Sequence, residues 1–160
     1  MAAAPSYADM YVSGALSFND HSHSNIDDAG GYTLGIGYRP ERGWLGGELS
    51  YIDAGDANIS GLGTLEMSGA SVSAVYWIQG EEGDAIGMRG NIKLGVYSMT
   101  ATVAPSTADS KGYRLGMGFE FKINNHLGWY TDLDGYFLVD ATNDNEDNLA
   151  VLSLGLRYYF

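Results

Sequence analysis

Alternation of apolar and polar side chains along most of the chain predicts an all-β protein. Side chains point to opposite faces at successive positions of a strand, so a period of two marks strands with two different faces. The pattern is clearest in the segment 112–122, where one face is wholly apolar: Tyr113, Leu115, Met117, Phe119 and Phe121. The same period appears in seven other segments: 8–19, 31–39, 44–53, 67–78, 88–99, 128–138 and 149–160. Eight such strands predict an antiparallel up-and-down barrel of the smallest closed size.

The connections between these segments alternate in length. Those after the second and sixth strands are tight, Pro40-Glu41-Arg42-Gly43 and Asn124-Asn125-His126, and the connection 79–86 is longer but compact. The connections after the first, third, fifth and seventh strands are each predicted to be polar and about nine to twelve residues long. Short turns at one end and longer loops at the other are typical of transmembrane barrels, with the turns periplasmic and the loops extracellular.

The charged residues indicate which face of the strands is interior. Outside the connections, nearly all of them fall on one face: Arg39, Glu48, Arg89, Lys93, Arg114, Glu120, Lys122, Asp132, Asp134 and Arg157. This face holds six of the eight basic residues and only four of the twenty acidic ones. Enclosed charges need partners, so the near match predicts a paired cluster inside the barrel, acting as a static plug or as a switchable gate. A soluble sandwich with a charged outer face is the alternative.

Aromatic residues gather near the strand ends and favour the membrane interpretation. One group lies toward the predicted periplasmic rim: Tyr38, Trp44, Tyr76, Phe121, Trp129, Tyr158 and Phe160. A second lies toward the extracellular rim: Phe18, Tyr32, Tyr51, Tyr113 and Phe137. Two such girdles are expected at the headgroup levels of a membrane, although aromatic residues are also common in strands generally.

The last segment, Gly155-Leu156-Arg157-Tyr158-Tyr159-Phe160, resembles the C-terminal assembly signal of outer-membrane barrels, carried by Leu156, Tyr158 and Phe160. In length and strand number the chain is similar to the small barrels that include the OmpA membrane domain and the OmpX/Ail group. This resemblance implies an integral outer-membrane protein that contacts lipopolysaccharide and the barrel assembly machinery. We expect two departures from these proteins: the absence of the peptidoglycan-binding domain that follows the barrel in full OmpA proteins, and loops too short for the protruding strands of OmpX-type proteins.

Composition narrows the function classes. The formal net charge of −12 argues against nucleic-acid binding, since few basic groups could neutralise phosphates. The absence of cysteine excludes disulfides, thiolate metal sites and cysteine nucleophiles. No apolar run reaches the roughly 18 residues of a membrane helix. We interpret residues 1–160 as one barrel domain, with 1–7 a short periplasmic segment of a mature chain that begins after its signal peptide, and we expect a monomer.

Candidate sites for chemistry are few, and no cofactor is expected. His21 and His23, beside Asp20, could ligate a transition metal, or form a solvated turn. Ser24-Asn25 does not complete the motif of lipid A deacylases, because position 22 is serine rather than histidine. The loop 140–147 has alternate oxygen ligands but lacks the central glycine and glutamate spacing of a calcium loop.

The predicted extracellular side is strongly acidic. Eleven acidic residues lie in or beside its loops, opposed only by Lys111: Asp20, Asp27, Asp28, Asp53, Asp56, Glu66, Asp109, Asp140, Asp144, Glu146 and Asp147. Such a rim attracts divalent cations that could bridge it to lipopolysaccharide phosphates, or it serves solubility alone. The sequence therefore favours a non-enzymatic structural or surface-interaction protein. A narrow ion channel gated by the interior charges is the alternative, followed by a lipid A-modifying enzyme; the lumen is too narrow for general porin traffic.

Overall fold

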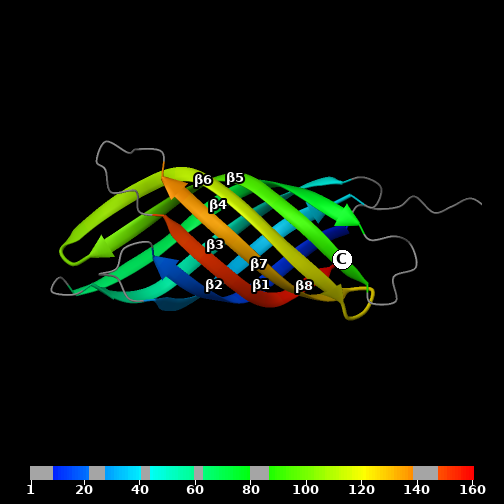
Figure 1. Ribbon diagram of the computed structural model, residues 1–160, viewed down its shortest axis with the longest axis horizontal. Coiled ribbons are helices and arrows are strands. Elements are labelled where there is room, and N and C mark those ends of the chain that lie inside the picture. The colour runs from blue at the N-terminus through cyan, green and yellow to red at the C-terminus, as the bar shows by residue number, and fades with distance from the viewer. Residues whose placement is uncertain (1–8, 22–27, 41–43, 60–62, 80–86, 139–147) are drawn as a thin grey trace, which may run out of the picture.

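The computed structural model describes residues 9–21, 28–40, 44–59, 63–79, 87–138 and 148–160, which form eight strands. Their bounds are β1 Asp9–His21, β2 Ala29–Arg39, β3 Leu45–Ile59, β4 Gly63–Gln79, β5 Met88–Val103, β6 Ser106–Lys122, β7 Leu127–Leu138 and β8 Leu149–Tyr159. Each strand pairs antiparallel with the next, and β1 pairs with β8, so the sheet closes in sequence order (Figure 1). The predicted barrel is confirmed, and the soluble sandwich is wrong. In the described part of the chain no helix is long and apolar enough to cross a membrane.

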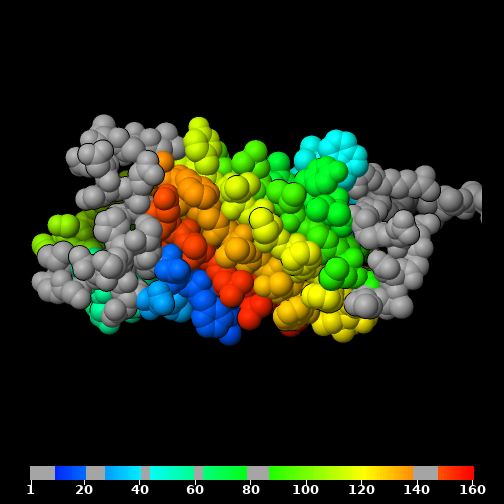
Figure 2. Space-filling model, viewed as in Figure 1, coloured from blue at the N-terminus to red at the C-terminus, as the bar shows by residue number. Residues whose placement is uncertain are grey.

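The two faces of the sheet have opposite chemistry. The outer wall carries exposed apolar side chains, such as Leu16 at 67% and Leu94 at 62% exposure. Figure 2 shows the side of this wall where β1, β8 and β7, in blue, red and orange, face the viewer. The inner face holds buried polar and charged residues, including Arg157 at 0% exposure. An apolar exterior around a charged interior is stable only where hydrocarbon replaces water outside, which is the arrangement of a transmembrane barrel.

The C-terminal strand is held between two neighbours. β8 pairs with β7 on one side and with β1 on the other, so it closes the ring. The backbone N–H of Phe160 donates to the carbonyl of Met10 at 3.0 Å. Figure 1 shows the C-terminus at the end of the barrel opposite the β5–β6 turn. With the C-terminus on the periplasmic side, as in outer-membrane barrels, the β5–β6 turn is extracellular.

Four strands continue beyond the apolar band of the wall, so two of the predicted long loops are largely strand. β3 continues to Ile59 and β4 begins at Gly63, while β5 continues to Val103 and β6 begins at Ser106. We call residues 54–59, 63–68, 98–103 and 106–111 the projecting sheet; in Figure 1 its hairpins reach furthest from the C-terminus. The prediction that protruding strands are missing was therefore wrong.

The polarity of the strands reverses where they leave the membrane, and this hid the extension. On β5 the outward residues are apolar from Met88 to Val96, roughly 20 Å of membrane for a strand tilted by about 40°. The outward residues then become polar at Ser98, Thr100 and Thr102. Inward residues change the opposite way, because the inner face of the projecting sheet packs as an apolar cluster: Ala29, Ile59, Ala57, Leu65, Met67, Ala101 and Val103.

A β-bulge joins the projecting sheet to the barrel. The β3–β4 register shifts between Asp53 and Asp56, and Gly55 there has a positive φ of 72°. The bulge presses β3 against β2, so a Cβ on Gly31 would lie 1.9 Å from the carbonyl oxygen of Asp53. Only glycine fits between the two backbones at this point.

We predict that Gly31→Ala destabilises the barrel by several kcal/mol, because relieving the overlap requires movement of the β3 backbone. Gly47→Ala is the matched control: its Cβ would meet nothing closer than 3.8 Å. Urea unfolding in detergent, followed by the heat-modifiable mobility on gels, measures both. Equal stability of the two variants would contradict the close packing at the bulge.

Candidate functional site

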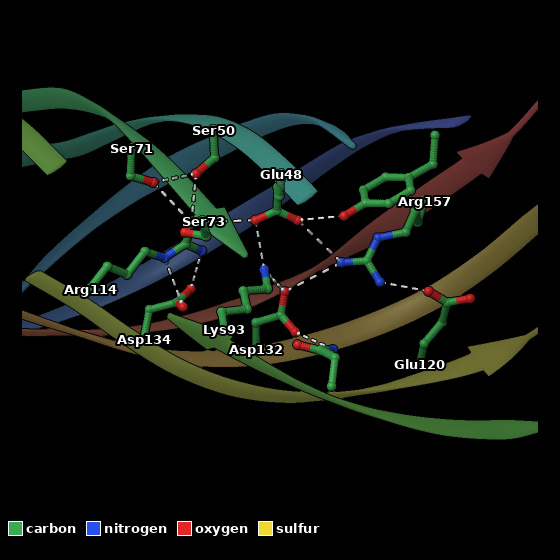
Figure 3. A network of polar contacts seen from close by, with 12 residues as sticks. Glu48, Ser50, Ser71, Ser73, Lys93, Arg114, Glu120, Asp132, Asp134 and Arg157 are labelled. Atoms are coloured by element: carbon green, nitrogen blue, oxygen red, sulfur yellow. Dashed lines mark hydrogen bonds and ion pairs between the residues drawn. The ribbon is translucent and has the colours of Figure 1, made fainter. Parts of the chain in front are cut away.

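A network of charged side chains fills the middle of the lumen (Figure 3). Five strands, β3 and β5 to β8, contribute its charged members, and each residue is no more than 5% exposed: Glu48, Lys93, Arg114, Glu120, Asp132, Asp134 and Arg157. Three cations thus face four carboxylates inside the barrel. Their burial makes mutual pairing obligatory, because an unpaired charge in a dry interior is strongly unfavourable.

Glu48 on β3 is the centre of the network. One carboxylate oxygen accepts from Lys93 Nζ at 2.8 Å and lies 3.3 Å from Arg114 Nη1. The other accepts from the Tyr11 hydroxyl at 3.0 Å and lies 3.8 Å from Arg157 Nη2. All three cations of the network therefore depend on this one carboxylate.

Arg114 on β6 crosses the lumen to the β3–β4 wall. Its Nε and Nη2 donate to the two oxygens of Asp134 at 2.9 and 2.8 Å, a bidentate pair. Its Nη1 donates to the hydroxyls of Ser50 and Ser71 at 2.7 and 2.9 Å. The small serine side chains leave room for the guanidinium and satisfy its remaining donor.

Asp132 and Glu120 complete the periplasmic side of the network. Asp132 accepts from Lys93 Nζ at 2.7 Å and lies 3.5 Å from Arg157 Nη2. Arg157 Nη1 donates to Glu120 at 2.6 Å, and the Tyr159 hydroxyl donates to the same oxygen. Lys93 and Arg157 are thus each shared between two or more carboxylates, so the network is continuous rather than a set of separate pairs.

Glycines on β6 make space for the aspartates of β7. A Cβ on Gly116 would lie 2.0 Å from an oxygen of Asp134, and one on Gly118 would lie 1.8 Å from an oxygen of Asp132. The carboxylates of Asp134 and Asp132 therefore occupy the space that the Cβ of any residue other than glycine at positions 116 and 118 would fill. The alternation of glycine with charge on this strand is part of the construction of the network.

Aromatic rings close the lumen on the periplasmic side of the network. Tyr11, Val75, Trp77 and Tyr159 form a buried cluster, with the Tyr11 and Trp77 rings edge-to-face at 6.1 Å. The guanidinium of Arg157 lies 4.8 Å from the Tyr11 ring centroid on one side of this cluster. The guanidinium of Arg39 lies 4.4 Å from the Tyr159 ring centroid. These cation–π contacts join the charged and aromatic layers.

An apolar cluster closes the lumen on the extracellular side: Ile52, Ala54, Tyr97, Met99, Tyr136, Leu149 and Val151. Beside it, β1, β2 and β8 carry four buried side-chain oxygens that find no partner among the described protein groups: Ser17 Oγ, Asn19 Oδ1, Thr33 Oγ1 and Ser153 Oγ. Buried polar atoms of this kind normally bind ordered water. The interior is thus layered, with charge held between an aromatic and an apolar layer.

Comparison with known proteins agrees with this architecture. The family described as "Outer membrane protein beta-barrel domain" matches residues 1–160. The chain belongs to this family. It is therefore an integral protein of the bacterial outer membrane. No curated protein matches the chain in sequence.

Solved outer-membrane barrels share the fold at low sequence identity. Neisserial surface protein A is 16% identical with a TM-score of 0.66, covering 94% of this chain and 97% of that one. The N-terminal barrel domain of OprF from Pseudomonas aeruginosa is 17% identical with a TM-score of 0.65, covering 96% and 100%. Ail, the attachment invasion locus protein of Yersinia pestis, is 13% identical with a TM-score of 0.60, covering 96% and 99%.

Three of the ten charged residues expected in the interior lie outside the network. Lys122 is exposed at the end of β6, and Arg89 is partly exposed at the start of β5. Within the described residues, neither forms an ion pair with a member of the network. Both occupy the rim, where the lumen opens and water can solvate a charge. Arg39 is buried but belongs to the aromatic layer. Tyr11, Tyr159 and the serines were not expected in the network, although their inward positions on the strands were the available signal.

The remaining candidates are placed as follows. Leu156, Tyr158 and Phe160 all face outward and are exposed on the wall. The His21 side chain and His23 fall outside the described part of the chain, as do 1–7 and the loop 140–147. Among the described residues, no three histidine, aspartate or glutamate side chains are grouped closely enough to hold a metal ion.

We predict that Glu48→Ala destabilises the barrel by about 3–5 kcal/mol, because it leaves three buried cations short of a partner. Glu66→Ala, an exposed glutamate on β4, should change the free energy of unfolding by less than about 0.5 kcal/mol. Urea titration in detergent micelles compares the two. A Glu48→Met/Lys93→Met double variant should recover part of the loss; failure of Glu48→Ala to exceed the control would contradict the central role of Glu48.

Proposed function

We propose that the protein is a non-enzymatic surface protein whose barrel anchors an acidic projecting sheet that binds cationic partners. The observation that carries this proposal is the outer face of that sheet. Asp56 of β3 and Glu66 of β4 are directly opposite in the antiparallel register, and both are exposed. Like charges at opposed positions destabilise a sheet, so the arrangement favours a positively charged group brought from outside.

The surroundings of this pair extend the surface. Glu66 is opposite Thr102, whose hydroxyl lies 3.4 Å from that of Thr107, and the Thr100 hydroxyl donates to Asp109 at 2.8 Å. Among the described residues, 106–111 of β6 pair only with β5, because the described β6–β7 pairing ends at Gly112. A polar ladder of this kind is a surface on which a partner could align.

The ligand solved with one structural neighbour carries charge of the same sign as this surface. Ail of Yersinia pestis has been solved in complex with sucrose octasulfate, a heparin analogue and therefore a polyanion. Six acidic residues lie on the described extracellular side here, against one lysine: Asp20, Asp28, Asp53, Asp56, Glu66 and Asp109. This charge supports binding of cationic partners and opposes binding of heparin-like ones.

We predict that the protein in phosphatidylcholine nanodiscs binds immobilised polylysine at 50 mM salt and does not bind heparin. Asp56→Asn/Glu66→Gln should weaken polylysine binding about tenfold, because it removes the opposed carboxylates. Asp20→Asn/Asp28→Asn removes the same total charge outside the projecting sheet and is the matched control. Surface plasmon resonance measures both.

Equal weakening by the two double variants would show that only net charge matters and would contradict a site on the sheet. Loss of folding does not explain a selective effect, since removing a like-charge pair should leave the thermal stability unchanged or raise it. Binding of heparin by the wild-type protein would also contradict the proposal.

The layered lumen supports an anchoring role over the alternative of ion conduction. Charged, aromatic and apolar layers occupy its length, and each of Lys93, Arg114 and Arg157 pairs with at least one carboxylate. Arg157 Nε is the one donor of these three cations without a hydrogen-bond partner among the described residues. A network in which every cation is paired favours a plug.

We predict that planar-bilayer recordings show no discrete openings for the wild-type protein or for Glu120→Ala. The second variant tests gating, because Glu120 binds Arg157 at 2.6 Å and its loss would release that cation. Openings in the wild type that change in frequency in Glu120→Ala would establish a gated channel instead.

A further inference from the structure

The β6–β7 turn lies against the end of the C-terminal strand; in Figure 1 it is the yellow turn at the end of the barrel where the C-terminus lies. The turn first closes on itself, since the backbone N–H groups of Ile123 and Asn124 donate to the carbonyl of Leu127 at 2.8 and 3.1 Å. The Asn124 side-chain oxygen accepts from the backbone N–H groups of His126 and Leu127 at 2.8 and 2.9 Å. Asparagine commonly bonds the backbone two residues further on in a turn, and here it uses the backbone N–H of His126 within the turn.

This arrangement leaves the last rung of the β7–β8 ladder without its usual backbone donor. Leu127 is opposite Tyr158 in the antiparallel register, so His126 is opposite Tyr159. In a hydrogen-bonded pair of an antiparallel ladder, each residue donates its N–H to the carbonyl of the other. The Tyr159 N–H does donate to the His126 carbonyl, at 2.7 Å, but the N–H of His126 is occupied by Asn124.

The imidazole of His126 supplies the missing hydrogen bond. Its Nδ1 lies 3.1 Å from the carbonyl oxygen of Tyr159. A carbonyl oxygen only accepts, so Nδ1 carries a hydrogen and donates it. The ring also stacks on Tyr158, with the centroids 6.0 Å apart, and the Tyr158 ring contacts Phe160 edge-to-face at 5.3 Å. One side chain thus contacts both the backbone and the outward aromatic face of the strand end.

The strand end held by this turn is connected to the rest of the barrel on two further sides. Toward the lumen, the Tyr159 hydroxyl donates to Glu120, which also accepts from Arg157 at 2.6 Å. Toward β1, the backbone N–H of Phe160 donates to the carbonyl of Met10 at 3.0 Å. Displacement of Tyr159 would therefore disturb both the closure of the ring and the interior network.

We propose that His126 is a latch on the C-terminal strand: its Nδ1–H replaces the backbone donor of the last β7–β8 rung and keeps the periplasmic end of β8 from opening. Strand ends open at lower free energy than strand centres, so a side-chain contact placed there controls local opening. The latch lies at the opposite end of the barrel from the projecting sheet, and this inference does not depend on the proposed function.

The test compares two variants of similar shape. His126→Asn keeps a donor near the position of Nδ1, whereas His126→Leu has none, and both remove the ring that stacks on Tyr158. Hydrogen exchange of the barrel in micelles, followed by NMR, reports the Tyr159 amide directly. We expect exchange at Tyr159 to be about tenfold faster in His126→Leu than in His126→Asn, the factor that corresponds to the net contribution of one hydrogen bond. Exchange at Leu94, in the middle of β5, should be the same in both.

Asn125→Ala is the matched control, because it removes an exposed polar side chain from the same turn. Equal exchange at Tyr159 in Asn125→Ala and His126→Leu would overturn the latch, and so would an equal acceleration at Tyr159 and Leu94, which would show a global loss of stability. Nitrogen NMR of the imidazole, assigned by comparison with His126→Asn, gives an independent readout. A hydrogen on Nδ1 is expected, and a neutral ring that carries its hydrogen on Nε2 would contradict the bond to Tyr159.

Discussion

The seven charged side chains of the network are enclosed in a lumen that water cannot freely enter, so each of them must be neutralised by a group on another strand. This requirement constrains the whole barrel. Glu48 of β3 must reach Lys93 of β5 and Arg114 of β6, and a slip of one residue in any of these strands would turn its charge into hydrocarbon. Pairing inside therefore fixes the strand register that the apolar outer wall alone would leave open, since many apolar side chains fit lipid equally well.

The layers on either side of the network determine where function can be located. The Tyr11–Trp77–Tyr159 layer and the apolar extracellular cluster exclude solvent from the charges, which strengthens each ion pair and makes rearrangement unfavourable. A lumen packed in this way supports the proposed anchoring role. Under that proposal, the projecting sheet above the membrane is the surface available to partners.

Strand number, strand faces and closure could be predicted from the sequence because the membrane imposes a simple period of two on each strand. The projecting sheet could not be predicted. On β5 the outward residues change from apolar at Val96 to polar at Ser98, and the inward residues become apolar at the same point. The period of two continues, but the two faces exchange polarity, so the strands looked as if they had ended. The charged interior was predicted as a group, but individual partners were not. Lys122 shares the inward face with Glu120, and only its position at the rim removes it from the network.

The lumen and the projecting sheet each contain residues that disfavour a β-sheet, glycines in the first and opposed like charges in the second. Inside, glycines such as Gly118 are placed so that Asp132 can meet its cations, and the carboxylates are satisfied within the chain. Outside, Asp56 and Glu66 oppose each other across two strands with no described cation opposite either. A sequence that can match charge so closely in its lumen, yet leaves these carboxylates opposed, favours a function that supplies the positive charge from beyond the protein.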